Sequence, residues 1–84
     1  MSDAVEVLFR NRFYPVSAAT VEAMGTNAWT VRIPVSDPIH KKVRRPPTPE
    51  GWDGAVLLVG EVETEPGLGS GLRKGCVEIS VYAI

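Results

Sequence analysis

A basic, proline-rich segment from Ser36 to Trp52 interrupts this chain and constrains what its 84 residues can fold into. The segment reads SDPIHKKVRRPPTPEGW and holds four of the seven prolines in the chain. Charged residues and prolines are rarely buried, so we expect this segment to supply no core. The core must then come from the residues on either side. We refer to Ser36–Trp52 as the basic insertion.

Apolar stripes on both sides of the insertion predict β-strands. Apolar and polar residues alternate over residues 5–10, 29–35 and 77–83, which is typical of strands with one buried face. The segment Gly54–Glu65 begins as a continuous apolar run and then alternates, which also predicts strand structure. Residues 66–75 contain four glycines and predict a long hairpin loop without regular structure.

Residues 16–24 allow two interpretations. As a helix, the segment would begin at an N-cap on Ser17 and end at Gly25. As a strand, it would pair with residues 29–35 across the three-residue connection Gly25-Thr26-Asn27. We favour the hairpin, because nothing else in the chain favours a helix.

These elements predict an all-β fold, a single β-rich domain over residues 1–84. The expected architecture is a small SH3-like barrel or a sandwich of about five strands. The insertion would form a projecting loop over residues 36–53, between the third and fourth strands. A domain this small buries little surface, so homo-oligomerisation would add to its stability.

Composition bears on where such a chain works. Its single cysteine cannot form an internal disulfide, which favours a reducing compartment or a stabilising partner. The first twelve residues include Asp3 and lack the apolar run of a signal peptide. The longest purely apolar run, Ala55–Val59, is far shorter than a membrane span. We predict a cytoplasmic protein, or a virion-associated one after cytoplasmic assembly, that does not bind membranes.

Residues that could support catalysis, metal binding or phosphate binding are sparse. We interpret His40, three residues after Asp37, as an exposed loop histidine, and Cys76 as a packing residue. One cysteine and one histidine fall short of the roughly four ligands of a structural metal site. The glycines of residues 67–71, followed by Arg73 and Lys74, lack the spacing of a phosphate-binding loop. We therefore expect no enzyme activity, no cofactor and no metal.

The basic insertion itself has three interpretations. Its four Lys and Arg residues could contact nucleic-acid phosphates, although the net charge of −1 does not favour a dedicated nucleic-acid binder. Residues 44–49 could lie along a partner as a polyproline II segment. The insertion could also be a solvated loop. Trp52 would serve either as the anchor that returns the loop to the body or as an interface hot spot.

An acidic stripe offers a second clue. Glu61, Glu63 and Glu65 alternate along a predicted strand, so they should project from one face. Like charges in such a row favour a cationic partner nearby. The basic insertion of the same copy or of a neighbouring copy could supply that partner.

We therefore predict a non-catalytic protein–protein interaction or assembly module that docks through its insertion. Small components of phages or other mobile elements are analogous in size and character. One alternative is a nucleic-acid-binding β-barrel, and another is a small inhibitor of a host enzyme. The predicted partner-binding residues are Lys41, Lys42, Arg44, Arg45, Pro46, Pro47, Trp52, Glu61, Glu63 and Glu65.

Overall fold

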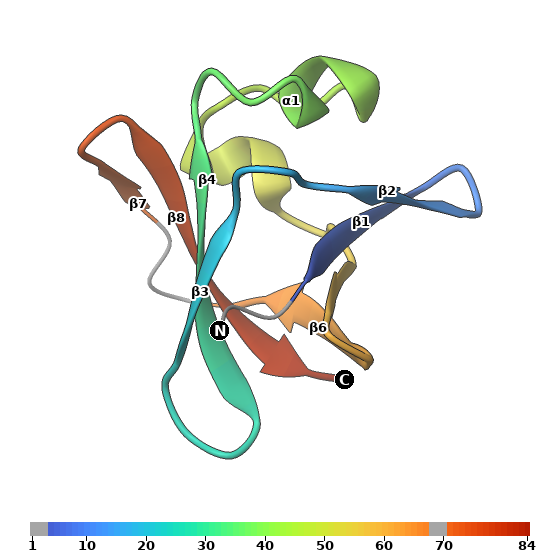
Figure 1. The fold of residues 1–84 in the computed structure, drawn as a ribbon, viewed down its shortest axis with the longest axis vertical. Helices are drawn as coiled ribbons and strands as arrows, with labels where there is room; N and C mark the ends of the chain where they lie inside the picture. The colour runs from blue at the N-terminus through green and yellow to red at the C-terminus, as the bar shows by residue number, and fades with distance from the viewer. Residues whose placement is uncertain (1–3, 68–70) are drawn as a thin grey trace.

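A computed structural model describes residues 4–67 and 71–84, which form eight antiparallel strands and two short helical segments (Figure 1). The strands pair in the order β2-β1-β5-β6-β8-β4-β3, and β7 also pairs with β8. The all-β prediction is confirmed. The sheet does not close into a barrel, because β2 and β3, the strands at its two ends, do not pair with each other. The elements are β1 (Val5–Phe9), β2 (Arg12–Pro15), β3 (Thr20–Ala23), β4 (Ala28–Pro34), α1 (Ile39–Lys42), the 3-10 segment η1 (Pro49–Trp52), β5 (Leu57–Val59), β6 (Val62–Pro66), β7 (Gly71–Arg73) and β8 (Cys76–Ala83).

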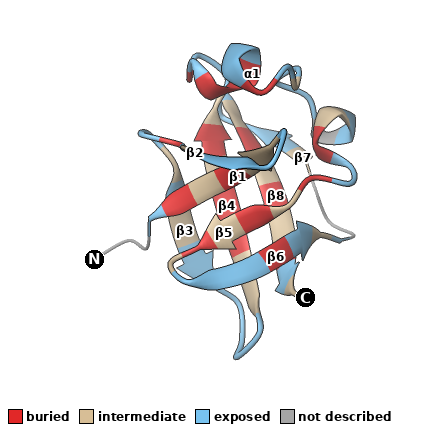
Figure 2. Cartoon of the chain, turned by 90° about the vertical axis from the view of Figure 1, so that its right-hand side faces the viewer, coloured by how far each residue is buried: buried red, intermediate tan, exposed pale blue. Residues whose placement is uncertain are grey.

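The core lies on the concave side of the sheet, where the predicted apolar stripes meet (Figure 2). Alternate residues of β8 are buried, and their partners in register on β4 are buried with them, as in Val31 opposite Ile79 and Ile33 opposite Val77. This alternation is what a sheet with one buried face requires. The fully buried strand residues are Val7, Val31, Ile33, Leu57, Thr64, Val77, Ile79 and Val81.

Residues 20–23 form a strand, which confirms the hairpin interpretation over the helical one. β3 pairs with β4 from Thr20 opposite Arg32 to Ala23 opposite Trp29. The Met24 N–H donates to the Ala28 carbonyl at 2.9 Å, which closes the connection through residues 25–27.

Two strands that the sequence pattern did not predict, β2 and β7, are held by tight two-residue turns. Arg10 and Asn11 link β1 to β2 with φ of 52° and 64°, and Lys74 and Gly75 link β7 to β8 with φ of 52° and 76°. Two consecutive positive φ values are the mark of a type I′ turn, whose twist matches paired strands. The expectation that residues 66–75 lack regular structure is therefore wrong for β7.

The segment Gly54–Glu65 is likewise two strands rather than one. β5 and β6 pair with each other, with Val59 opposite Val62, so Gly60 and Glu61 form the turn. Gly60 has a φ of 61°, which an amino acid with a side chain rarely adopts. Glu61 thus lies in the turn, and only Glu63 and Glu65 lie on β6.

The expectation that the basic insertion supplies no core is wrong. Ile39, Val43 and Trp52 are at most 1% exposed and belong to the core. Ile39 and Val43 are four residues apart, so the turn of α1 places both on one face. η1 packs against β8. In the described part of the chain, no helix has the length and apolar character needed to cross a membrane.

An ion-pair cluster joins three strands on the outer face of the sheet. Arg32 on β4 lies opposite Glu78 on β8, and its Nε donates to Glu78 Oε2 at 2.9 Å. A second nitrogen of the Arg32 guanidinium, Nη2, contacts Glu22 Oε1 on β3 at 3.1 Å. The hydrogen bonds that Arg32 donates, first to Glu78 and then to Glu22, raise the pKa of Arg32 above its usual value. Arg32 is therefore paired with two carboxylates of the sheet itself.

Replacing Trp52 with Ala should lower the free energy of unfolding by about 3–5 kcal/mol, because it leaves a large cavity beneath the insertion. Leu72→Ala is the matched control, since Leu72 is 60% exposed; it should cost less than about 0.5 kcal/mol. Urea denaturation followed by circular dichroism measures both. Equal effects of the two substitutions would contradict the packing described above.

Candidate functional site

Asp37 fixes the start of the basic insertion. Its carboxylate is buried and accepts two backbone hydrogen bonds, from the Ile39 N–H at 2.9 Å and from the Ala18 N–H at 3.2 Å. The first bond forms an Asx turn that leads into α1. The second ties the insertion to the segment before β3. Neither oxygen is hydrogen-bonded to the His40 ring, so the suggested pairing of a carboxylate with an imidazole is not formed.

Arg45 and Pro46 fix the second half of the insertion. Arg45 Nη1 donates to the carbonyls of Gly51 at 2.6 Å and Asp53 at 3.1 Å. The Pro46 ring lies against Gly51, where an added Cβ would be 2.7 Å from Pro46 Cγ. A larger residue at Gly51 would therefore displace the loop.

The polyproline II interpretation of residues 44–49 is wrong. Arg44 has a φ of 53°, in the left-handed region that polyproline II excludes. The Thr48 N–H donates to the Pro46 carbonyl at 2.8 Å, which turns the chain, and Pro49 begins η1. The prolines therefore shape a compact loop.

His40 is buried, contrary to the expectation of an exposed loop histidine. It is 6% exposed, and its ring meets that of Trp52 edge to face at a centroid distance of 5.7 Å. Its Nε2 lies 2.9 Å from the Pro34 carbonyl, which can only accept a hydrogen bond, so Nε2 carries the proton. In the neutral ring Nδ1 is then an acceptor, and it has no partner among the described residues.

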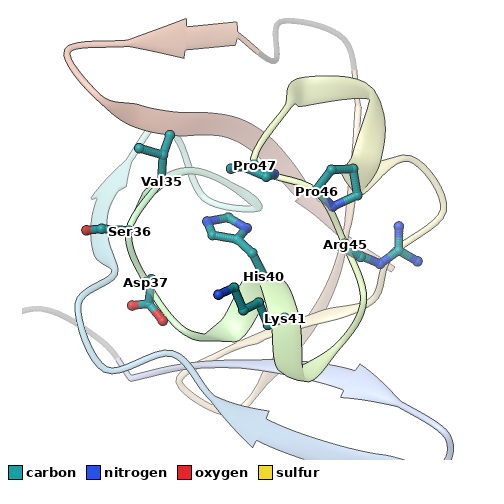
Figure 3. A pocket seen from close by; sticks show the side chains of 8 residues that line it. All are labelled: Val35, Ser36, Asp37, His40, Lys41, Arg45, Pro46 and Pro47. Atoms are coloured by element: carbon teal, nitrogen blue, oxygen red, sulfur yellow. The ribbon is translucent and has the colours of Figure 1, made fainter.

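A hollow opens beside His40 (Figure 3). Its volume of about 380 Å³ suits a small ligand or one protruding side chain. Val35 and two prolines give it an apolar wall, and the Lys41 side chain lies next to the His40 ring. The lining residues are Val35, Ser36, Asp37, His40, Lys41, Arg45, Pro46 and Pro47.

Three of the four predicted cations lie on the surface. Lys41, Lys42 and Arg44 are exposed, whereas Arg45 is half-buried and holds backbone carbonyls. The β7–β8 turn lies beside the start of the insertion, because the Gly75 carbonyl accepts a hydrogen bond from the Val35 N–H at 2.9 Å. Arg73 and Lys74, at this turn, therefore add positive charge near the insertion. We refer to Lys41, Lys42, Arg44, Arg73 and Lys74 as the basic end.

The acidic stripe lies on the other side of the molecule. α1 lies above β1 and β5 in Figure 2, and β6 runs below them. Glu61, Glu63 and Glu65 are all exposed, and among the described residues no ion pair joins them to the basic end. Pairing of the two charge blocks within one copy is therefore not what the structure shows.

Trp52 and Cys76 occupy different surroundings. Trp52 is fully buried, so it acts as the anchor of the insertion and has no exposed surface in this structure. Cys76 is half-buried and lines a second hollow with Arg32, Arg73, Lys74 and Glu78. His40 does not line that hollow, so the structure does not bring the histidine and the cysteine together there.

Other candidate chemistry is limited. Part of the glycine-rich segment, residues 68–70, lies outside the described residues, and Gly71–Arg73 form β7 rather than a loop before a helix. Within residues 4–67 and 71–84, no group of His, Cys, Asp and Glu side chains is arranged to hold a metal ion. No protein-family model, curated relative or solved structure matches this chain.

Replacing Asp37 with Asn should lower the free energy of unfolding by about 1–3 kcal/mol, because an amide cannot accept both backbone hydrogen bonds. Asp53→Asn is the matched control, since the Asp53 side chain is exposed and makes no hydrogen bond among the described residues. Thermal denaturation compares the two variants. A control as unstable as Asp37→Asn would rule out this role for the carboxylate.

Proposed function

We propose that the chain is a non-catalytic protein-interaction or assembly module that docks through its basic insertion. The observation that carries this proposal is that exposed lysines lie on a segment whose apolar residues are buried in the core. Ile39, Val43 and Trp52 anchor the insertion in the core, while Lys41 and Lys42 point to solvent. Because the backbone is already ordered, docking would lose less conformational entropy than binding through a free loop.

The partner we propose is a protein surface that is acidic and carries an apolar group. Exposed cations steer and orient such a partner, but they supply little affinity by themselves. The hollow lined by Val35, Pro46 and Pro47 would supply apolar contact at the centre of the interface. A cytoplasmic or virion-associated setting, as for small phage components, remains part of this proposal.

Nucleic acid is the second candidate partner. The position of the β7–β8 turn favours it, because Arg73 and Lys74 extend the positive surface beyond the insertion. Five cations on one side would give salt-sensitive contacts to phosphates. Two features weigh against nucleic acid as the partner. One is the pair of exposed acids in or beside η1, Glu50 and Asp53, and the other is the net charge of −1.

Replacing Lys41 and Lys42 with Gln should weaken binding of a labelled oligoglutamate peptide about two- to thirtyfold, since each of the two exposed pairs contributes about 0.2–1 kcal/mol. Arg10→Gln with Arg12→Gln is the matched control, because it removes the same charge from the β1–β2 turn and should change little. Fluorescence anisotropy measures both affinities.

The same assay with a labelled DNA duplex separates the two candidates. Tight duplex binding that falls steeply with salt and is lost on replacing Lys41 and Lys42 would favour nucleic acid over protein. Equal losses from the lysine and arginine pairs would contradict docking through the insertion.

A further inference from the structure

We infer that the partner of the basic end is the acidic side of a second copy of this chain, so that copies associate head to tail. This inference rests on the proposed function and names its partner. It is carried by the surface around β6 and the end of β8, which complements the hollow in the insertion in charge and also offers an apolar ring.

Tyr82 and two glutamates form this second surface. Glu65 lies directly opposite Tyr82 in the β6–β8 register, so their side chains share one face. Glu63 lies two residues earlier on the same face, and all three residues are exposed. The Tyr82 ring lies against Gly67, where an added Cβ would overlap it. The ring thus packs on the Gly67 backbone, and 45% of the residue stays exposed.

The two surfaces are complementary in charge, and both include apolar groups. The hollow is lined by apolar Val35, Pro46 and Pro47 and also by the cationic side chain of Lys41. On the other surface, the ring of Tyr82 lies next to the carboxylates of Glu63 and Glu65. An exposed aromatic ring that can meet proline rings, with opposite charges around them, suits an interface with an apolar centre and a polar rim.

The arrangement of the surfaces determines the type of assembly. α1 and β6 lie on opposite sides of β1 and β5, so a copy cannot satisfy its own charges (Figure 2). The contact joins two different surfaces, which leaves one basic and one acidic surface free after each addition. Such an interface produces open chains or larger rings instead of a two-fold dimer.

Two charge-reversed variants test this inference. The first is Lys41→Glu with Lys42→Glu, and the second is Glu63→Lys with Glu65→Lys. In sedimentation equilibrium at low salt, the mass of the wild type should rise with concentration, while each variant alone stays monomeric. An equimolar mixture should associate again, into alternating chains, because each reversed surface then meets a surface of opposite charge on the other variant. Arg10→Glu with Arg12→Glu should behave as the wild type.

His40 reports which surface of each copy is engaged. It is the only histidine, so labelling one variant and adding unlabelled wild type gives a single imidazole signal. That signal should shift when the labelled copy is the Glu63→Lys, Glu65→Lys variant, which uses its hollow. It should not shift when the other variant is labelled. Tyr82→Leu should weaken association about two- to tenfold while the circular dichroism spectrum is unchanged.

Three results would overturn the inference: a wild type that stays monomeric throughout, variants that still associate alone, or a mixture that does not pair. The first result leaves the proposed function standing if the oligoglutamate peptide still binds through Lys41 and Lys42. Loss of the peptide result instead removes the proposed function, whatever the copies do with one another.

Discussion

The burial of Trp52 is the interaction on which the rest of this structure depends. Its ring is fully enclosed, meets His40 edge to face and belongs to a segment that packs on β8. Through this contact, a stretch rich in prolines and charges becomes part of the fold, lying across one end of an open sheet (Figure 1). Without it, the cations would sit on a mobile loop, and ordering that loop on binding would cost affinity.

The fold was predictable where a strand has one buried face. Alternation in β4 and β8 indicated both their extent and the side that faces the core. β2 escaped prediction because a mostly exposed edge strand carries no such pattern. β7 escaped because its surroundings are rich in glycine, although Lys74-Gly75 is a fitting hairpin turn. A single glycine, Gly60, divided what looked like one strand into two.

The candidate site was predictable in its charges and not in its architecture. Composition identified Lys41 and Lys42 as exposed, and the period of two placed Glu63 and Glu65 on one face. The four-residue spacing of Ile39 and Val43 was a readable signal for a buried helical turn, hidden among prolines. Nothing local indicated the burial of His40, because Pro34 and Trp52 enclose it only after the chain has folded. The pairing of β6 with β8 likewise brings Tyr82 beside Glu65.

The central claim is that the basic insertion is an ordered part of the fold, and amide hydrogen exchange tests it most directly. The N–H groups of Val43, Arg45 and Gly51 donate to backbone carbonyls within the insertion at 3.0, 2.8 and 3.1 Å. If Trp52 holds the insertion in place, these amides exchange far more slowly than in an unstructured chain, and Trp52→Ala removes that protection first. Exchange at the unstructured rate in the wild type, while β4 and β8 stay protected, would contradict the account.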